Sequence, residues 1–509
     1  MTKIISPDPT YVPLTPATPV QYNLTNDRLT ELLNHIKAIN DFGHLTAHDA
    51  GGQHKAYIDV AAYASLSAAI TAIGATETVL YITNNQSIAS AVTVPTNITI
   101  RRGHGGKFTK SGTGTLAFNG PFEWSLTQAF YGFSAGDVTF GNGSVKKFYL
   151  EWWGGDQYGV IESAAAFQAA IDAPAWYGKV LITGNFRISS QILGRDAITL
   201  QGFGHDFTNG VPSRLNFSTL TTAHCLLING KTRMNINDIY LTGPSSGAFG
   251  TIVFSGSSRH VNMRNVTVNT SSTGNAIDSL AGTLITSTWD NVRTVGGGYG
   301  IAIGETCTSI NMHTCYATSG TSGGFLLKGT YINCFGCAGD GNYYAYVIQN
   351  ASQVGLYGCG GETSIRTAVY LLGTTTGVTI TGFRSHANNS SGIANMPSFL
   401  NVRSTVSNVT VIDCRDSSPH ASTVNSVASY DPGTPAFETP GPYLEIIHPN
   451  FDKLIHANVL GLKKGTTANR PTYGVNDALK TYLDTTLDAD GKPITWTGTA
   501  WVDATGAVV

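Results

Sequence analysis

A pattern of alternating hydrophobic and polar residues repeats along the middle of the chain. Nine segments share it, each with alternation over the first four residues, a turn-forming fifth residue and an apolar sixth residue. Alternation with a period of two predicts a β-strand, and a strand that recurs at similar intervals predicts a solenoid. The segments begin at Ile198, Met234, Val261, Ser287, Ile310, Ile332, Val354, Val378 and Val409.

The fifth residue of each segment predicts a sharp bend between two strands. Eight of the nine are Gly, Asn or Asp, and the exception is Thr314. Gly, Asn and Asp tolerate the left-handed backbone conformation, which lets the chain turn within one residue. The fifth residues are Gly202, Asp238, Asn265, Asn291, Thr314, Gly336, Gly358, Gly382 and Asp413.

The sixth residues set the length of one coil. They recur at intervals of 36, 27, 26, 23, 22, 22, 24 and 31 residues. A coil of about 22 residues with loops of variable length predicts a parallel β-helix, which is an all-β solenoid. The sixth residues are Phe203, Ile239, Val266, Val292, Cys315, Cys337, Cys359, Phe383 and Cys414.

Cysteines occupy four of these sixth positions. If the sixth residue points into the core, Cys315, Cys337, Cys359 and Cys414 form a column of buried thiols. Cys334 and Cys337 form one isolated C-x-x-C pair, which is weak support for a metal site. The chain has 7 cysteines, an odd number, so we expect reduced core thiols and neither a metal nor a cofactor.

Helical patterns occur only before the repeats. Residues 66–73 are Ala-rich, and Ser163 can cap a second helix over 164–171. Apolar residues in steps of 3 and 4 after Leu29 predict a short helical neck over 21–42, either in an oligomer or as one amphipathic helix packed on its own domain. Residues 1–20 hold five prolines, which predicts an extended arm.

Composition excludes several classes of protein. Only 12% of the residues are charged, the net charge is -2 and 41% are hydrophobic. These values exclude a disordered chain. The chain has no excess of basic residues, which argues against nucleic-acid binding. The N-terminus lacks the apolar run of a signal peptide, and no stretch approaches the roughly 18 apolar residues of a membrane span. We therefore expect a protein made in the cytoplasm that does not insert into membranes.

The outward positions of the coils carry the candidate chemistry. If the sixth residue points inward, the seventh and ninth point outward, and the ninth residues of three consecutive coils are Asp340, Glu362 and His386. Neighbouring coils lie about 4.8 Å apart. Glycoside hydrolysis uses two carboxyl groups about 5–5.5 Å apart (retaining) or about 6.5–9.5 Å apart (inverting), and their repulsion raises one pKa. We predict that Asp340 and Glu362 form this pair.

Further residues could bind the substrate. Arg384 is an outward seventh residue, and Arg366, Tyr343 and Tyr344 lie in connecting segments. Arginine can hold acidic groups of a glycan, and tyrosine rings can stack on sugars. His386 with an arginine would instead suit a lyase, in which a base removes a proton next to a carboxylate. The alternative interpretation is a solvated wall of polar residues, with tyrosines in a subunit interface.

The run FYLEWWGGDQYGVIESAAAFQAAIDA at 148–173, followed by VLITGNFRIS, resembles a known family. It is similar to the start of the pectate-lyase-like right-handed β-helix of bacteriophage tailspikes and capsular polysaccharide depolymerases. Glu151, Trp152, Trp153 and Gly154 match the first part of that motif, and residues 163–171 match its capping helix. Residues 465–506 resemble a terminal module of phage tail fibres.

The resemblance implies a single-stranded right-handed parallel β-helix, a homotrimer, a bacterial surface polysaccharide as substrate, and a place in the virion. The chain would join the phage tail or baseplate through its N-terminal region. The expected domains are the arm (1–20), the neck (21–42), a lead-in domain (43–150), the β-helix with the substrate site (151–445) and the C-terminal module (446–509). The expected activity is endo-glycoside hydrolysis, with a polysaccharide lyase and a non-catalytic adhesin as alternatives.

Overall fold

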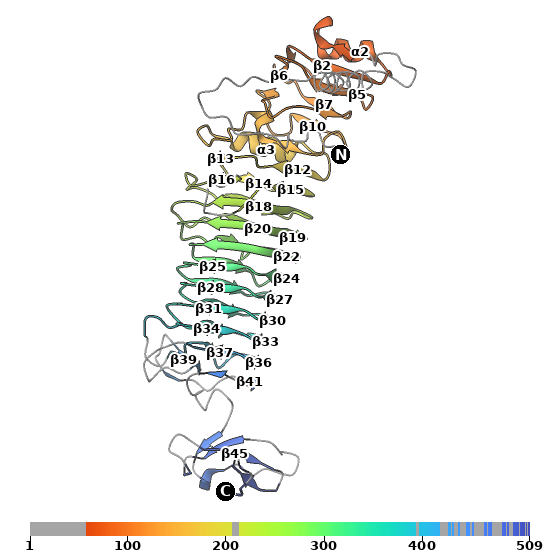
Figure 1. The fold of residues 1–509 in the computed structure, drawn as a ribbon. Coiled ribbons are helices and arrows are strands. Elements are labelled where there is room, and N and C mark those ends of the chain that lie inside the picture. The colour runs from red at the N-terminus through yellow and green to blue at the C-terminus, as the bar shows by residue number, and fades with distance from the viewer. Residues whose placement is uncertain are drawn as a thin grey trace, which may run out of the picture.

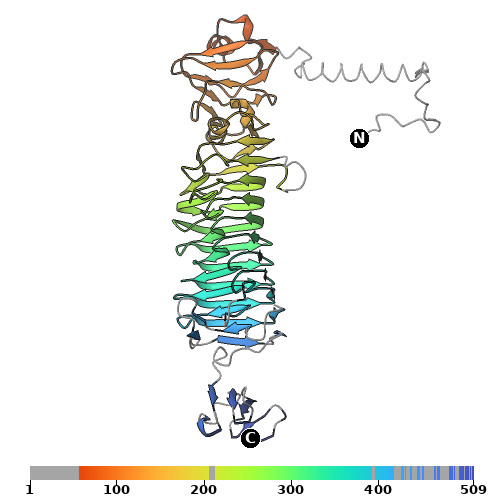
Figure 2. The ribbon, with the colours of Figure 1, turned by 90° about the vertical axis from the view of Figure 1, so that its left-hand side faces the viewer.

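A computed structural model describes residues 57–205, 213–392, 396–417 and shorter stretches between 426 and 509. The chain winds into an all-β, right-handed parallel β-helix of about 13 turns, drawn as a rod of stacked coils in Figures 1 and 2. The fold class predicted from the repeats is therefore confirmed. The predicted arm (1–20) and neck (21–42) lie outside the described residues.

Each coil places three strands in three parallel columns along the rod. The first column contains β11 (Phe148–Tyr149), β12 (Gly178–Leu181), β15 (Ile198–Gln201), β18 (Asn235–Thr242), β20 (Asn262–Asn269), β22 (Gly282–Val295), β24 (Thr308–His313), β27 (Thr330–Phe335), β30 (Ser352–Tyr357), β33 (Thr376–Thr381), β36 (Ser407–Ile412) and β41 (Leu444–Ile447). Strands β18, β20 and β22 continue through the bend into the second column.

The second column follows the bend. It contains β13 (Asn185–Arg187), β16 (Arg214–Asn216), β25 (Tyr316–Thr318), β28 (Ala338–Asp340), β31 (Gly360–Glu362), β34 (Arg384–His386), β37 (Arg415–Asp416) and β42 (Asn450–Phe451). The third column contains β14 (Ile192–Leu193), β17 (Leu226–Asn229), β19 (Ile252–Arg259), β21 (Ile277–Asp278), β23 (Tyr299–Ile303), β26 (Gly323–Leu327), β29 (Tyr346–Gln349), β32 (Val369–Leu372), β35 (Leu400–Val402) and β38 (Val427–Ala428).

Left-handed residues bend the chain at two places in all but one of the nine repeated coils. The predicted bend at the fifth position is confirmed for eight of the nine segments, including Thr314 (φ 50°), and Gly202 is the exception. A second left-handed residue, which the sequence pattern did not predict, stands directly before each segment. These residues are Ala197, Arg233, His260, Thr286, Ser309, Tyr331, Gln353, Gly377 and Asn408.

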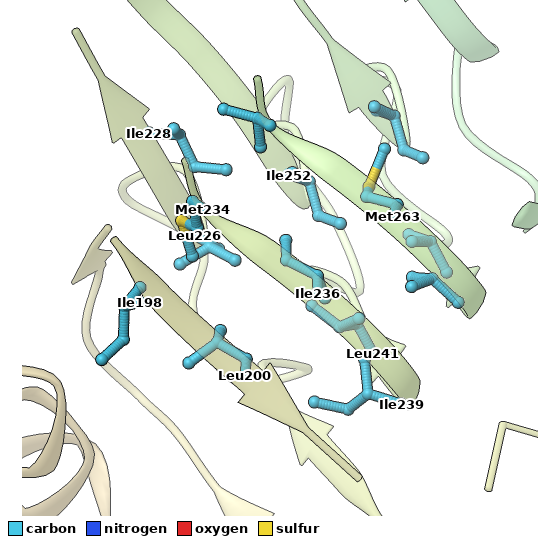
Figure 3. Packing of buried hydrophobic residues seen from close by; sticks show 14 of the residues in the cluster. Ile198, Leu200, Leu226, Ile228, Met234, Ile236, Ile239, Leu241, Ile252 and Met263 are labelled. Atoms are coloured by element: carbon cyan, nitrogen blue, oxygen red, sulfur yellow. The ribbon is translucent and has the colours of Figure 1, made fainter. Parts of the chain in front are cut away.

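The core is a continuous column of apolar side chains inside the coils. Eight of the nine predicted sixth residues are buried. Figure 3 shows the start of this column, with Ile236, Ile239, Leu241 and Met263 packed between neighbouring coils. Each coil therefore buries its apolar face against the coils above and below, as the repeat requires.

The prediction that Phe203 is a core residue is wrong, because its side chain is 62% exposed. No left-handed bend forms at Gly202 in this coil, and the second strand is supplied later by β16. Ser213, just before β16, is fully buried, accepts a hydrogen bond from the Phe203 amide and donates one to the Ile182 carbonyl. The chain therefore leaves the core at Phe203, and the second strand of this coil begins only at Arg214.

The predicted column of thiols is confirmed. All seven cysteines are free and buried. The Cys337 thiol donates to the Met312 carbonyl (3.5 Å), and the Cys359 thiol to the Cys334 carbonyl (3.3 Å). A thiol at this position therefore links its coil to the preceding one.

Both predicted helices are present. Helix α2 (Leu66–Ile73) begins at Ser65, whose side chain accepts a hydrogen bond from the Ala68 amide. Helix α3 (Ala164–Asp172) follows Ser163, but the Ser163 side chain makes no capping hydrogen bond, which corrects the prediction. The Glu162 carboxylate instead accepts from the Ala164 amide, because the Ser163 hydroxyl is used by the Asp156 amide. Among the helices of the described residues, none has the length and apolar character needed to cross a membrane.

The residues before β11 also form parallel strands. One sheet contains β1 (Tyr57–Asp59), β2 (Thr78–Ile82), β5 (Ile98–Arg102) and β8 (Phe122–Glu123), a second contains β3 (Asn85–Ile88), β6 (Lys107–Lys110) and β9 (Phe130–Tyr131), and a third contains β4 (Val92–Val94), β7 (Leu116–Phe118) and β10 (Val138–Phe140). Short 3-10 turns occur at η1 (Val60–Ala62) and η2 (Leu150–Trp153). The proposed domain boundary at 150 stays a prediction.

The EWWG motif packs in the core at this junction. Trp152 and Trp153 in η2 are buried, and the Trp152 ring contacts Phe122 and Phe140. Burial raises the pKa of the Glu151 carboxyl, which binds the Thr183 hydroxyl. This motif therefore has a structural role where the first coils meet α3.

The end of the chain contains two further small sheets. Strands β39 (Tyr430–Asp431) and β40 (Ala436–Phe437) pair antiparallel. The last sheet contains β43 (Lys463–Gly465), β44 (Thr481–Asp484), β45 (Lys492–Trp496) and β46 (Trp501–Val502), with a 3-10 turn η3 (Thr467–Asn469) between β43 and β44. Trp496 pairs with Trp501 across the β45–β46 hairpin, and their ring centres are 5.6 Å apart.

Candidate functional site

Three ionisable side chains share one register on neighbouring coils. Asp340 ends β28, Glu362 ends β31 and His386 ends β34. In the strand pairing, Asp340 lies beside Glu362, and Glu362 lies beside His386. Strands in a sheet are about 4.8 Å apart, so the side chains form the column that the sequence predicted. Glu362 and His386 are exposed, and Asp340 is half-buried.

The surroundings of Asp340 favour its protonated form. Burial raises the pKa of Asp340, and the nearby Glu362 carboxylate raises it further. Hydrogen bonds from the Tyr316 hydroxyl and the Glu362 amide oppose this rise, because they stabilise the ionised form. The net effect is a raised pKa for Asp340 beside an exposed carboxyl group.

Tyr316 is a site residue that the sequence analysis missed. It is the seventh residue of its coil, on β25, and its hydroxyl lies close enough to Asp340 on the next coil to lower the pKa of Asp340. Burial raises the pKa of Tyr316, and the Asp340 carboxylate raises it further. The Arg293 guanidinium lies over the Tyr316 ring, 5.3 Å from its centre. Strand alternation places the seventh residue of each coil outward and could have identified Tyr316, but Arg384 was the one site residue predicted at that position.

Small residues occupy the outward seventh positions beside the two acids, on the second column of strands. At the seventh position, Ala338 pairs with Gly360, and Gly360 pairs with Arg384. No side chain larger than a methyl group therefore stands beside Asp340 and Glu362 on their own strands. Arg384 is exposed and pairs with Arg415 on the following coil, so positive charge follows the acids along the rod.

His386 lies at the same end as the two arginines. One of its ring nitrogens, Nδ1, is 3.1 Å from the Ser417 hydroxyl. Below the column, the buried Asn388 amide donates to the Gly361 carbonyl (2.7 Å) and to the Ser385 hydroxyl (3.0 Å). The Ser385 hydroxyl in turn donates to the buried Asp416 carboxylate (2.8 Å). These buried hydrogen bonds hold the strand ends that carry the outward groups.

Arg366, Tyr343 and Tyr344 form a separate cluster. The Arg366 Nε donates to the Tyr343 hydroxyl (3.0 Å), and the guanidinium lies 5.1 Å from the centre of the Tyr343 ring. Tyr344 packs edge-on against Tyr343 and stacks on Tyr370, and burial raises the pKa of Tyr344. Among the contacts of the described residues, none joins this cluster to Asp340, Glu362 or His386. Their predicted role in substrate binding stays a prediction.

A column of aromatic rings on the first strands was also missed. His313, Phe335 and Tyr357 are the fourth residues of three consecutive coils and lie just before the bend. Their rings stack with centres 4.9 and 5.1 Å apart. Phe335 is exposed, so this column presents an aromatic surface on the outside of the rod. Strand alternation predicts that the fourth residue of each coil points outward, so the aromatic column could have been found from the sequence.

Metal-ligating groups do not gather in the part of the chain that the structure describes. No set of three or more His, Cys, Asp or Glu side chains there is arranged to hold a metal ion. Asp340, Glu362 and His386 follow one another along the rod, one per coil, instead of converging on a point.

Comparison with known proteins finds similar solved structures at low sequence identity. No protein-family profile matches the chain, and no curated protein matches it in sequence. In structure, the A-module of the Azotobacter vinelandii mannuronan C-5 epimerase AlgE6 is 15% identical, covers 60% of this chain and 96% of its own, and has a TM-score of 0.43. The tailspike gp42 of Acinetobacter phage vb_AbaP_AS12 is 13% identical over 70% of this chain and 76% of its own, with a TM-score of 0.42.

A third similar structure is the N-terminal fragment of gene product 12 of bacteriophage Phi29. It is 14% identical, covers 62% of this chain and 58% of its own, and has a TM-score of 0.44. At these identities and TM-scores the similarities carry no conclusion about this chain, and its β-helix is established by its own strand pairing. Activity has to be argued from the residues of this chain.

Proposed function

We propose that this chain is a phage tailspike that binds and depolymerises a bacterial surface polysaccharide by endo-glycoside hydrolysis. The observation that carries the proposal is the pairing of Asp340 with Glu362 on neighbouring coils, together with the raised pKa of Asp340. Two carboxyl groups with separated pKa values supply the acid and the base that glycoside hydrolysis needs. The homotrimer, the attachment to the phage tail through the N-terminal region and the place in the virion belong to the same proposal.

The two carboxyl groups have different roles in the reaction. Protonated Asp340 gives its proton to the glycosidic oxygen while the C1–O bond breaks and its electron pair stays on the leaving sugar. Ionised Glu362 either forms a bond to C1 or removes a proton from a water molecule that attacks C1. In the first case, Asp340 then takes a proton from the water that hydrolyses the glycosyl-enzyme.

Positive charge on the second column of strands indicates that the substrate is an acidic polymer. Arg384 and Arg415 lie one after the other beyond the acids, and Arg384 is exposed. A guanidinium group binds carboxylates with two parallel hydrogen bonds, so a uronate or another acidic sugar suits this end of the site. Ala338 and Gly360 leave room for a sugar ring beside the carboxyl groups.

The test uses the full chain and purified capsular polysaccharides from a panel of encapsulated bacteria. We expect new reducing ends and a fall in polymer mass with at least one polysaccharide. Asp340→Asn and Glu362→Gln should each lower this rate by about 10²–10⁴, the usual contribution of an acid or base. Asp290→Asn is the matched control, since Asp290 is an acid with a half-exposed side chain two coils from Asp340.

The outcomes separate the alternatives. Wild-type rates in both variants would contradict the assignment of the acid pair. Binding without any shortening of the polymer would identify a glycan adhesin.

A lyase is the second candidate, because His386 and Arg384 point outward from one strand. Neutral His386 would remove the proton from C5 of a uronate, a double bond would form between C4 and C5, and the C4–O bond would break. The departing oxygen then takes up a proton. Arg384 would stabilise the negative charge on the carboxylate. New ultraviolet absorbance from the unsaturated uronate, lost in His386→Ala, would identify this reaction.

A further inference from the structure

A pocket of about 260 Å³ lies at the N-terminal end of the β-helix, far from the acid column. Its walls are the loop after β10 and the segment between α3 and β12, and its lining includes Phe140, Asn142, Lys146, Pro174, Trp176 and Tyr177. In the first column, β12 stands six coils before β27, which begins the coil of Asp340. At about 4.8 Å per coil the two places are about 30 Å apart.

The walls of this pocket are held together by the backbone. The Phe140 amide donates to the Ala173 carbonyl, and the Ala175 amide donates to the Phe140 carbonyl, both at 2.8 Å. The Arg195 guanidinium donates to the carbonyls of Ile171 (3.2 Å) and Asp172 (2.8 Å) at the end of α3. The segment that leads into Trp176 is therefore held against the end of β10 and against Arg195.

Two large aromatic side chains stand exposed at this pocket. Trp176 is 51% exposed and Tyr177 is 61% exposed. Their ring centres are 5.3 Å apart and the rings are nearly perpendicular, at 85°. Such rings present flat apolar faces with little conformational freedom to lose on binding.

Tyr177 is anchored by a second contact. It has the left-handed conformation that precedes a first strand, and its hydroxyl accepts a hydrogen bond from Arg233 (3.0 Å). Arg233 has the same position two coils later, and Ala197 is the residue between them. The small Ala197 side chain lets Arg233 reach Tyr177, so the ring is held in one orientation at the pocket.

The charge at the pocket is positive. Among the described residues that line it, Lys146 is the only one that is charged at neutral pH, and its side chain is exposed. Asn142 adds an exposed amide that can donate or accept hydrogen bonds. The volume is below the roughly 300–1,000 Å³ of pockets for drug-sized ligands, so it suits one or two sugar rings.

We infer that this pocket is a second saccharide-binding site, which holds an acidic sugar unit against Trp176 and Tyr177 with Lys146 at its carboxylate. No carboxyl group lines the pocket in the described structure, so the site binds without cleaving. The inference rests on the proposed function for the kind of polymer. A long glycan held here and processed at the acid column would lie along the rod.

The experiment measures binding to the full chain by saturation-transfer NMR and calorimetry. The probes are tetragalacturonate and tetraglucuronate, with maltotetraose as the neutral counterpart. All titrations use the Asp340→Asn/Glu362→Gln background, so that binding is measured without cleavage. The acid column keeps Arg384 in this background and can still hold a uronate, so the second site is identified by the share of binding that Trp176→Ala and Lys146→Gln remove.

We expect a uronate probe to bind more tightly than maltotetraose. Trp176→Ala and Lys146→Gln should each weaken uronate binding by about fivefold, the usual contribution of one stacked ring or one exposed charge pair. Tyr331→Ala is the matched control, because Tyr331 is 58% exposed and has the same left-handed position before its strand. It should leave the affinity unchanged.

Three results would overturn the inference. The first is the absence of binding by both uronate probes. The second is an equal affinity in the Asp340→Asn/Glu362→Gln protein and in the same protein carrying Trp176→Ala or Lys146→Gln. The third is a change of oligomeric state in Trp176→Ala by light scattering with unchanged affinity, which would make this surface a contact between copies of the chain. Lys146→Gln keeps the test valid if Trp176→Ala fails to fold.

Discussion

The hydroxyl group of Tyr316 lies close enough to the carboxylate of Asp340 on the next coil to lower the pKa of that carboxyl group by hydrogen bonding. Tyr316 pairs with Ala338, two residues before Asp340, so the contact runs diagonally between two strands. The bond stabilises the ionised carboxylate, while burial and the Glu362 carboxylate favour the protonated form. Tyr316 is therefore the neighbour through which the protonation of Asp340 can be changed without altering either acid.

Tyr316→Phe should move the pH dependence of the proposed hydrolysis. The change removes the hydroxyl that lowers the pKa of Asp340, so that pKa rises. Since the general acid works when protonated, the alkaline limb of the kcat profile should shift to higher pH. At the optimum, kcat should stay within about tenfold of wild type, because one hydrogen bond contributes about 1 kcal/mol.

The measurement is a full pH–rate profile of the purified variant beside Tyr331→Phe, which changes an exposed tyrosine outside the site. A positioning role of Tyr316 predicts the shift of the limb, whereas a structural role predicts a uniform loss of rate. An unshifted profile would remove Tyr316 from the site.

Asp340→Asn should stabilise the protein at neutral pH. The pKa of Asp340 is raised in the folded state, so its contribution to stability is complete below the unfolded pKa and is lost as pH rises through the folded pKa. The side-chain amide in Asp340→Asn does not ionise, so this loss of stability at neutral pH does not occur in the variant. We expect a Tm about 1–2 °C above wild type near pH 7, a small gain because Asp340 is only half-buried and solvent screens it.

The two Tm values should converge near pH 3, where the wild-type carboxyl group is protonated in both states. Differential scanning calorimetry at matched scan rates gives both numbers, with Asp290→Asn as the control for a half-exposed acid. A gain that persists unchanged at low pH would contradict the link to the ionised carboxylate.

The repeat predicted the coil because two independent signals agreed. The period of two gave the strands, and Gly, Asn or Asp marked the bend between them. Thr314 bends as the others do, since the coils above and below impose the conformation on it. The second bend, before each segment, was missed because residues as different as Arg233, His260 and Tyr331 occupy it, so its composition carries no signal.

The register of the acids could be predicted, but their partners could not. Strand alternation is enough to place Asp340, Glu362 and His386 in one outward column. The contact of Tyr316 with Asp340 crosses from the seventh position to the ninth position of the next coil, and no pattern within one segment describes it. Arg366 lies in a connecting loop outside the alternation, so its pairing with Tyr343 was equally hidden.

The core thiols should be unreactive in the folded protein. All seven cysteines are buried, and burial raises the pKa of Cys225 and Cys414, the latter to about 11. Because the thiolate is the reactive form, an aromatic disulfide reagent should label none of them until the chain is unfolded. Counting labelled thiols by mass spectrometry with and without denaturant checks this. Rapid labelling of native Cys337 or Cys359 would contradict the inward column.

The left-handed backbone conformation at the bends should affect the free energy of unfolding. A Cβ at Gly358 (φ 60°) would meet no atom within 4 Å, so Gly358→Ala changes the backbone preference without a clash. A non-glycine residue in this conformation costs about 1–2 kcal/mol, and we expect Gly358→Ala to lose about 1 kcal/mol of unfolding free energy. Thr314→Asn should gain about 0.5 kcal/mol, because Asn tolerates the conformation better than a β-branched residue.

Gly360→Ala is the control for these variants, because Gly360 lies two residues beyond Gly358 and does not have a positive φ. Its Cβ would make only an ordinary contact with the Arg384 carbonyl, at 3.4 Å. Urea unfolding midpoints of the three variants separate backbone strain from the general effect of adding a methyl group. Equal losses in Gly358→Ala and Gly360→Ala would show that the left-handed bend is not the cause. A larger loss at Gly358 would mean that this coil depends on the left-handed conformation at its bend to align the outward strand.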